Sequence, residues 1–516
     1  MSELTRRRLI QTGLVAAASA SFGPGFWRNA LAAPPTVAAG PYGPLLPPDA
    51  NGLMLPSGFT SRVVARGDQV MPGQGNVFPR AADGQATYAT GDGGWILATN
   101  SEIGGGAGGV FATRFDAAGT VVDSYRILDG TSVNCAGGPT PWGTWLSCEE
   151  VPSGQVWECF PLGNQAAVAY PALGWFQHEA CCIDPVHEHI YLSEDVDGGC
   201  FYRFVPFDYP DLTAGVLQVA CPGVIPGTVE WQSVLDPNPD LPAPGTPTRS
   251  QIPTALKFRR GEGMWFDSGL VYLVTTADHK IHVYDTNTAG ISVLFEAGAV
   301  PGTPLTDPDN IHVSPRSRDV FVSEDRGGAD PMDVCILSPE GQIARFVKMT
   351  GAQHDSSEVI GLTFNPSGTR FYAGSQRAGG VGVVYEISGP FRPYTPPPAP
   401  PNPPSVALAL TTTRRISIAS LIRRGLAIAL TLDKASTVRF RLRARVTVKG
   451  KRKTVTLASV TRKPGVGATR LRLKPTKAGV KLLRARRRQL TATLEVRITT
   501  PGAPVRTLRR SVSLRP

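Results

Sequence analysis

Residues 183–195 read IDPVHEHIYLSED, and the same arrangement returns as VSPRSRDVFVSED at 313–325 and as FNPSGTRFYAGSQ at 364–376. Each copy contains a proline turn, a strand-like apolar run and then a polar residue. Glu194 and Glu324 lie nine residues after their prolines, and Gln376 lies ten after its own. An internal repeat of this kind predicts a fold built from copies of one unit, each of which brings a polar group to an equivalent place.

The chain around this repeat consists of short β-branched and aromatic runs separated by Gly, Pro, Asp and Asn. Residues 95–99, 271–274, 281–284 and 383–387 are such runs, and no long helical periodicity interrupts them. Runs and turns of this type are typical of β-hairpins. Hairpins repeated over roughly 350 residues favour a β-propeller of about six blades. We therefore predict an all-β fold with a six-bladed β-propeller at residues 34–393.

A proline-rich segment at residues 394–404 predicts a stiff, extended linker. Beyond it, residues 438–443, 470–473 and 493–498 alternate apolar and polar side chains. This alternation is the pattern of half-buried strands. It predicts a small Ig-like β-sandwich at residues 405–516.

The amino terminus has three arginines at residues 6–8, then a mildly apolar run, then small residues at 30–33 before Pro34. This order predicts a twin-arginine export signal at residues 1–33. We expect export beyond a bacterial inner membrane, to the periplasm, the cell envelope or the medium. Eight cysteines in an exported protein favour disulfides, but their spacing does not define a pairing.

Charge is divided unevenly along the chain. Residues 405–516 hold 29 Lys and Arg against Asp433 and Glu495, leaving 23 basic and 39 acidic residues in 1–404. The basic domain has one aromatic residue, Phe440, so it has little on which to stack bases, and we expect no specific nucleic acid. We expect it to contact anionic envelope polymers, with a solvated face that serves solubility as the alternative. The protein is expected to be a monomer.

Acidic residues gather at the ends of the strand-like runs. In an antiparallel pair, the first residue of one strand and the last of its partner lie at the same edge of the sheet. Four pairings follow from this rule: Glu179 with Glu194, Asp309 with Glu324, Glu358 with Gln376, and Glu262 with Thr275 or Asp278. Strands of the same kind end at Glu102 and at residues 148–150. The sequence thus predicts one rim that carries ten candidate metal ligands: Glu102, Cys148, Glu149, Glu150, Glu179, Glu194, Glu262, Asp309, Glu324 and Glu358.

Carboxylates crowded at one mouth repel one another unless cations neutralise them, so the rim predicts a metal cluster. Hard oxygen ligands favour calcium, whereas the thiolate of Cys148 would admit a transition metal such as iron. The alternative is that the acids cap turns and accept backbone hydrogen bonds. Cys148 is then a buried or disulfide-bonded cysteine.

Several stretches resemble the PhoX-type alkaline phosphatases, a family of exported bacterial six-bladed propellers. They are YGPL at 42–45, LPSGF at 55–59, TPWGTWLSCEE at 140–150, HEA at 178–180, FYRFVP at 201–206 and PDN at 308–310. The resemblance covers roughly residues 43–393, and the stretch at 142–150 is its most specific part. It implies phosphomonoester hydrolysis at a cluster of iron and calcium. The implied ligands are Cys148 on iron together with Glu149, Glu179, Glu262, Asp309 and Glu358.

Such a site would release phosphate from small phosphate esters by metal-activated in-line attack. An arginine would offset the charge that develops on the phosphate. The candidates for this clamp are Arg203, Arg326 and Arg377, and the catalytic group also includes Cys148 and Glu149. Two alternatives come from other classes: a calcium-dependent propeller lactonase without iron, and a non-enzymatic binding propeller that calcium stabilises.

Overall fold

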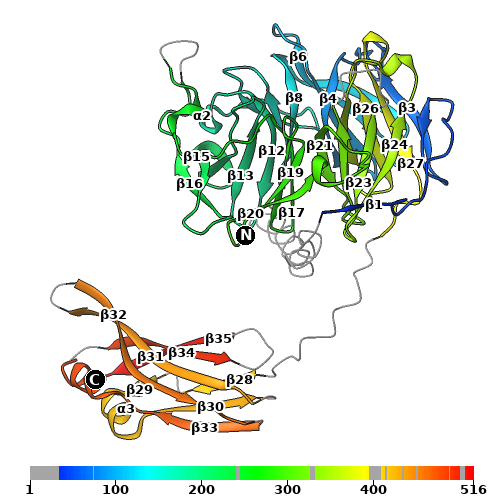
Figure 1. Cartoon of the computed structure of the whole chain (residues 1–516). Coiled ribbons are helices and arrows are strands. Elements are labelled where there is room, and N and C mark those ends of the chain that lie inside the picture. The colour runs from blue at the N-terminus through cyan, green and yellow to red at the C-terminus, as the bar shows by residue number, and fades with distance from the viewer. Residues whose placement is uncertain are drawn as a thin grey trace. The chain divides into compact units, whose positions relative to one another are not determined.

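The computed structural model describes residues 34–73, 75–239, 245–325, 332–393, 408–412, 415–432, 435–448, 451–465, 467–486, 489–499 and 506–516. The chain divides into two compact units, Met1–Tyr394 and Thr395–Pro516 (Figure 1). The predicted export signal at 1–33 and the predicted linker at 394–404 lie outside the described residues. No helix in the described ranges is long and apolar enough to cross a membrane.

The first unit has six sheets among its described residues, antiparallel apart from one short edge strand, and the strand order in each sheet runs from the innermost strand outward. The first is β4 (Ala82–Ala89), β5 (Trp95–Ser101), β6 (Gly108–Phe115) and β7 (Val121–Thr131). The second is β8 (Asn134–Pro139), β9 (Trp145–Glu149), β10 (Val156–Cys159) and β11 (Val168–Ala169). The third is β12 (His178–Asp184), β13 (His189–Glu194), β14 (Tyr202–Asp208), β15 (Asp211–Pro222) and β16 (Val229–Ser233).

The fourth sheet is β17 (Gly261–Asp267), β18 (Leu270–Thr275), β19 (Lys280–Asp285) and β20 (Gly290–Glu296). The fifth is β21 (Pro308–Val313), β22 (Val320–Glu324), β23 (Asp333–Leu337) and β24 (Gln342–Met349), with β1 (Thr36–Val37) and β2 (Leu53–Met54) added to β24. The sixth is β25 (Val359–Phe364), β26 (Arg370–Ser375), β27 (Val383–Ser388) and β3 (Thr60–Arg66). Short helical segments are η2 (Pro171–Leu173), α2 (Thr248–Gln251), η3 (Ala297–Ala299), η4 (Ala352–His354) and η5 (Ala378–Gly380).

These sheets form a closed ring, which is the architecture of a β-propeller. The innermost strands contact one another in the order β4, β8, β12, β17, β21, β25 and back to β4. The early strand β3 pairs with β27, so the sixth sheet joins the two ends of the unit. Each neighbouring pair of sheets encloses its own apolar cluster. The prediction of an all-β propeller is confirmed.

Packing on both sides explains why many strands lack strict alternation. All seven residues of β5 are buried, for example, because this sheet lies between two neighbours. A strand that is covered on both faces is apolar almost throughout.

The innermost strands share a bulge close to their start. In β12, His178 pairs with Glu194 and Cys181 with Leu192, so Glu179 and Ala180 oppose a single residue. The same two-against-one register occurs at the equivalent place in β4, β8, β17 and β21, and one residue later in β25. A bulge redirects a side chain away from the regular pleat. It therefore controls which residues point into the centre of the ring.

The second unit is a β-sandwich. One sheet has the order β28 (Leu408–Thr412), β30 (Leu426–Leu432) and β33 (Gly467–Leu473). The other has the order β29 (Arg415–Ser417), β35 (Arg506–Arg515), β34 (Leu490–Thr499), β31 (Thr437–Val448) and β32 (Lys451–Arg462). The helices are α3 (Ile418–Arg424) and α4 (Lys477–Arg484). In immunoglobulin lettering these sheets are A-B-E and A′-G-F-C-C′, so the Ig-like prediction is confirmed.

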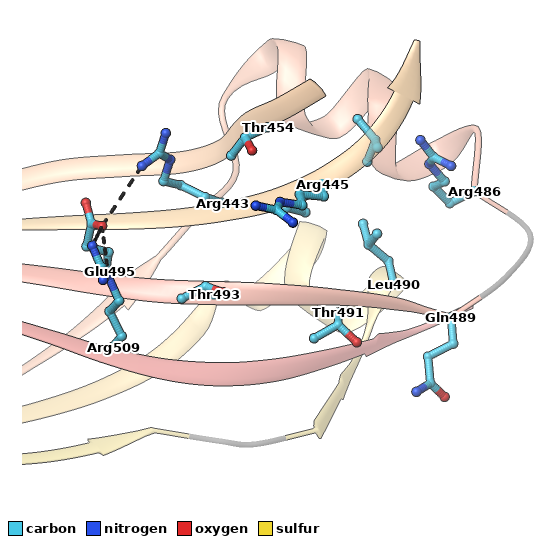
Figure 2. A pocket seen from close by; sticks show the side chains of 12 residues that line it. Arg443, Arg445, Thr454, Arg486, Gln489, Leu490, Thr491, Thr493, Glu495 and Arg509 are labelled. Carbon is cyan, nitrogen blue, oxygen red and sulfur yellow. Dashed lines mark hydrogen bonds and ion pairs between the residues drawn. The ribbon is translucent and has the colours of Figure 1, made fainter. Parts of the chain in front are cut away.

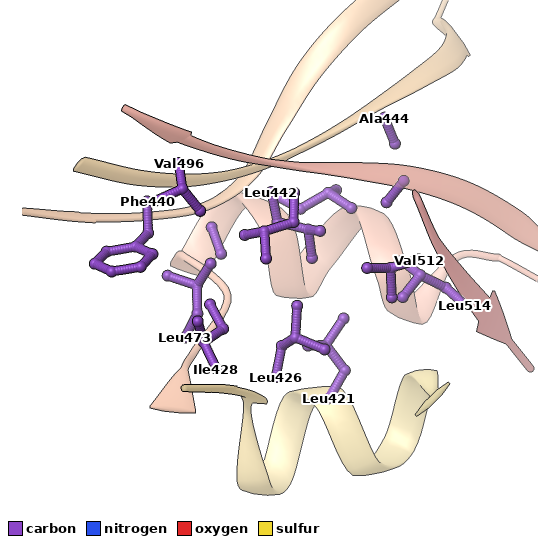
Figure 3. Close-up of a cluster of buried hydrophobic side chains, with 14 of the residues drawn as sticks. Leu421, Leu426, Ile428, Phe440, Leu442, Ala444, Leu473, Val496, Val512 and Leu514 are labelled. Atoms are coloured by element: carbon purple, nitrogen blue, oxygen red, sulfur yellow. The ribbon is translucent and has the colours of Figure 1, made fainter. Parts of the chain in front are cut away.

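Side chains from both sheets meet in the core of the sandwich. Phe440 and Leu442 from β31 lie opposite Leu426 and Ile428 from β30, with Leu421 of α3 closing one side (Figure 3). Alternate residues of β31 therefore point inward, which leaves the residues between them on the outer face of the sheet.

Candidate metal centre

The first residue of each bulge carries a potential metal ligand in five of the six propeller sheets. Because the innermost strands contact one another around the ring, these five side chains converge at its centre. They are Asp83, Cys135, Glu179, Glu262 and Asp309.

A second set of equivalent residues follows the second strand of each sheet. The backbone N–H of each of these residues donates to the carbonyl oxygen of the residue that precedes or begins the innermost strand. The N···O distance is 2.9 Å from Glu102 to Ala81 and 2.8 Å from Glu150 to Val133. The six residues of this set are Glu102, Glu150, Asp195, Thr276, Asp325 and Gln376. The repeated stretches of sequence end on this position, at Asp195, Asp325 and Gln376.

Seven of these side chains form three groups in which the potential ligand atoms lie within 4.8 Å of one another. The groups are Asp83 with Glu102 and Cys135, Cys135 with Glu150 and Glu179, and Glu179 with Glu262 and Asp309. Shared members link the groups into one array, which we call the metal centre. Six carboxylates and one thiol make up its donor set.

Unpartnered buried oxygens indicate that cations belong in the metal centre. Glu179 is fully buried, and neither of its carboxylate oxygens has a hydrogen-bond partner among the described residues. Oδ1 of Asp83 is in the same situation. A buried carboxylate without a partner is strongly unfavourable. The residues present therefore fit a group of bound cations.

The pKa values of the metal centre shift in the direction that this crowding dictates. Burial raises the pKa of Glu179 well above its ordinary value, and the charges of Glu262 and Glu150 raise it further. Burial also raises the pKa of Glu150 to about 8. Close to the metal centre, burial raises the pKa of Glu358 to about 7, although Arg377 acts in the opposite direction. Without cations, these carboxylates therefore bind protons at higher pH than an exposed carboxylate does.

The cysteine among the carboxylates is Cys135. Its Sγ lies 3.7 Å from Oδ2 of Asp83. Cys148, which the sequence analysis selected, lies opposite the bulge at Cys135, in the apolar cluster between the second and third sheets. Cys148 is fully buried, and burial together with a contact to Cys181 raises the pKa of its thiol well above its ordinary value. None of the eight cysteines forms a disulfide in the structure.

Besides Cys148, three predicted carboxylate ligands lie outside the metal centre and bind other groups. Oε1 of Glu149 accepts from the Ser132 backbone N–H at 2.9 Å, and Oε2 accepts from Trp157 Nε1 at 3.0 Å. Glu194 accepts from the Tyr202 hydroxyl at 2.8 Å and pairs with Arg249 at 2.9 Å.

Glu324, the third, accepts the backbone N–H of Thr306 at 2.7 Å. The predicted pairings were wrong by one residue for these acids, because Glu194 faces His178 and Glu324 faces Pro308. A shift of one residue turns a side chain to the opposite face of a strand. Thr275 likewise faces Gly261 rather than Glu262.

The remaining predicted pairing brings Gln376 and Glu358 together. The backbone N–H of Gln376 donates to the carbonyl of Glu358 at 3.1 Å. The side-chain amide of Gln376 donates to Asp83 at 2.6 Å and also to Glu102. Gln376 thus holds two carboxylates of the metal centre in place.

The three candidate arginines have different positions. Arg377 donates to Glu358 at 2.8 Å and lies 3.8 Å from Glu102. Arg203 instead donates to Gln218 at 2.9 Å and stacks 4.6 Å from the centre of the Trp231 ring, among the aromatic residues of a blade. Arg326 lies outside the described residues.

Sequence reasoning missed Arg260, an arginine that pairs with three acids of this region. Arg260 pairs with Asp195 at 2.9 Å, with Glu262 at 2.8 Å and with Asp325 at 3.8 Å. It immediately precedes β17 and has a φ of 49°, a left-handed conformation that is strained for residues other than glycine. The signal that could have found it is its position immediately before the Gly261-Glu262 step.

Comparison with known proteins identifies the family of this chain. A family model described as Alkaline phosphatase PhoX matches residues 99–159 and 154–379, together more than half of the chain. A search of curated proteins gave no match.

Solved structures give the fold. PhoX of Pseudomonas fluorescens in complex with vanadate, a transition state analogue, is 17% identical, with a TM-score of 0.56 over 67% of this chain and 97% of that chain. A protein of unknown function from Bacteroides thetaiotaomicron is more distant, with 10% identity and a TM-score of 0.39 over 64% of this chain and 76% of that chain. A gluconolactonase from Xanthomonas campestris is 14% identical, with a TM-score of 0.36 over 68% of this chain and 99% of that chain. The first of these matches supports the propeller fold.

Proposed function

Because the chain belongs to the PhoX alkaline phosphatase family and is a phosphoric monoester hydrolase, we propose that its activity depends on cations held by the metal centre. The observation that carries this proposal is Glu179, a fully buried carboxylate with two unpartnered oxygens at the point where two ligand groups meet. Family membership decides against the lactonase and the non-enzymatic alternative.

We propose calcium and iron as the cations. The six carboxylates suit a hard ion such as calcium, and the thiolate that Cys135 would supply suits iron. Cations bound there would act as Lewis acids toward the phosphoryl oxygens and would activate the attacking group for in-line displacement.

Two arginines have different proposed roles, one in positioning acids and one in binding phosphate. Arg260 is held among three acids, so its role is to fix Asp195 and Glu262 in place. Arg377 is half-exposed and has one short ion pair, to Glu358, which leaves N–H groups available for a ligand. Arg377 is therefore the proposed phosphate clamp, since a guanidinium can donate two parallel hydrogen bonds to phosphate oxygens.

The test combines elemental analysis with hydrolysis of a chromogenic phosphomonoester, before and after removal of metal by a chelator. We expect iron and calcium in the active protein, loss of turnover after chelation, and recovery when both metals are restored. Full turnover by protein shown to be metal-free would contradict the proposal. The family assignment would then stand without the metal dependence.

We also propose that the enzyme is exported by the twin-arginine route and acts on small phosphate esters in the periplasm, at the envelope or outside the cell. The three arginines at residues 6–8 support this. Replacing all three by lysine keeps the charge but should retain the protein in the cytoplasm. Unchanged export of that variant would contradict the proposed route.

A further inference from the structure

The outer face of the five-stranded sheet of the sandwich carries a row of arginines. Val438, Phe440, Leu442, Ala444 and Val446 of β31 are buried in the core. The residues between them therefore lie on the opposite face of the strand. They are Arg439, Arg441, Arg443 and Arg445. Two residues along a strand span roughly 6.6 Å, so the row presents cationic groups at regular steps.

Hydroxyl-bearing residues flank this row on the neighbouring strands. On β32, Thr461 is opposite Arg439, Ser459 is opposite Arg441, and Thr456 is opposite Arg443. On β34, Thr493 is opposite Arg443, and Arg497 is opposite Arg439. We call this surface, from β32 across β31 to β34 and β35, the arginine face. Because the hydroxyl side chains are short, the longer arginine side chains extend beyond them toward solvent.

The arginine face has little internal compensation of charge. Glu495 is its one acid in the described ranges, and it lies 3.4 Å from Arg509 and 4.0 Å from Arg443. Within the same ranges, Arg439, Arg441 and Arg445 form no ion pair, although Arg441 is directly opposite Glu495 in the register of β31 and β34. Like charges clustered on one face create a positive potential that attracts an anionic partner.

A hollow of about 780 Å³ continues the arginine face where β31 leaves β34. The register of these strands ends at Ala444 and Ala492, and beyond it their ends separate. Arg445 and Arg486 border the hollow, with Thr454 and Thr491 nearby (Figure 2). The cationic row therefore ends in a concave site rather than in a flat edge.

We propose that the arginine face binds an extended polymer with a phosphodiester in each repeat, such as a poly(glycerol phosphate) chain of a cell envelope. Arginine pairs with phosphate oxygens through two parallel hydrogen bonds, and hydroxyls can add single ones. Regular spacing along a strand suits a linear polyanion better than one compact anion. Phe440, the one aromatic residue after residue 405, is fully buried, so no base can stack on it.

The test compares two double variants of the full-length protein that remove the same charge from two sheets. Arg441→Thr/Arg445→Thr alters the arginine face, whereas Arg470→Thr/Arg472→Thr alters exposed positions on β33 of the other sheet. Binding to poly(glycerol phosphate) is measured over a series of salt concentrations. The thermal melting curve of each variant reports whether the sandwich is folded, and phosphatase activity reports only that the propeller is intact.

The face variant should bind about tenfold more weakly. The slope of log affinity against log salt concentration should become less steep by about two, one for each lost phosphate contact. The control variant should stay within about twofold of the unaltered protein. The same loss in both variants would overturn the proposal, because diffuse charge would then explain the binding. Tighter binding to polygalacturonate or to an oligothymidylate of equal charge would also overturn it, and so would absence of binding to the glycerol polymer.

Discussion

Cys135 and Cys148 differ in the groups around their sulfur atoms. Cys135 lies beside Asp83 and shares a ligand group with Glu150 and Glu179. Cys148 lies among apolar side chains between two sheets. A thiolate is stabilised by a metal ion but not by an apolar core. The two cysteines are therefore expected to respond very differently to substitution.

Cys135→Ser should remove the soft ligand and lower both the iron content and phosphatase turnover, the latter by about 100-fold or more. Cys148→Ala should leave iron content and turnover within about twofold and reduce the free energy of unfolding by about 1 kcal/mol, because it removes one buried atom. Metal analysis, turnover and thermal melting of both variants check this. Loss of iron from Cys148→Ala with iron retained in Cys135→Ser would reverse the assignment.

Arg377 and Arg203 provide a second comparison between single residues. Arg377→Gln should lower kcat/KM by about 100-fold, since one donor to the developing charge is worth that much in comparable sites. Arg203→Gln should lower the melting temperature, because it removes the contacts to Gln218 and Trp231, but should leave kcat/KM within about threefold. Steady-state kinetics with a phosphomonoester separates these outcomes. An equal loss of kcat/KM in both variants would argue against a direct role for Arg377.

At the scale of the strand, the bulge decides which residues form the metal centre. Glu179, Glu262 and Asp309 could be predicted from the sequence, because they precede apolar runs in the repeated unit. Glu102 and Glu150, which follow the second strands of their sheets, were also predicted, but in the repeats Glu194 and Glu324 were chosen in place of Asp195 and Asp325. This error arises because a bulge adds one residue to one strand without an obvious mark in the sequence. Asp83 and Cys135 were missed for a related reason, since their strands lack the proline and apolar pattern of the clearest repeats.

The second residue of the bulge is small in four of the six innermost strands, which lets these strands approach one another closely. A Cβ at Gly263 would lie 2.7 Å from the carbonyl oxygen of Asp309 and 2.8 Å from Cα of Asn310. Equivalent residues in three other innermost strands are also small: Gly84, Ala136 and Ala180. A larger side chain would push β17 and β21 apart at the level of the ligands.

Gly263→Ala should therefore reduce the free energy of unfolding by about 1–3 kcal/mol and weaken metal binding. Gly298→Ala is the matched control, because no atom lies within 4 Å of the Cβ that it would add. Chemical denaturation and metal analysis of both variants test this. Unaltered metal content in Gly263→Ala would mean that the centre tolerates separation of the two strands.

The molecule as a whole consists of two units with separate cores. The seven potential ligands of the metal centre lie in the first unit, and the arginine face lies in the second. Removing residues 394–516 should leave kcat, KM and metal content of the propeller within about twofold and abolish binding to the phosphodiester polymer. Kinetics and polymer binding of the truncated protein check this. A large change in kcat would show that the sandwich contributes to the reaction.

Protons and cations compete for the same carboxylates, and this competition should govern the stability of the whole propeller. In the metal-free protein, burial raises the pKa of Glu150 to about 8 and of Glu358 to about 7. The pKa of Glu179 and Asp83 is raised well above the ordinary value. The unfolded chain has carboxyl pKa values of about 4, so the folded form binds more protons between about pH 4 and 8, and stability falls as pH rises through this window.

The chelated protein should therefore melt at a progressively lower temperature from pH 5 to pH 9. The metal-loaded protein should show the opposite trend over the lower part of this range, because cations bind the deprotonated carboxylates and no longer have to displace protons at higher pH. Thermal melting of both forms across the range tests the prediction. The outcome against this prediction is a melting temperature of the chelated protein that does not change with pH, or equal melting temperatures of the two forms at pH 8. Either result would mean that the buried carboxylates are compensated by something other than metal ions.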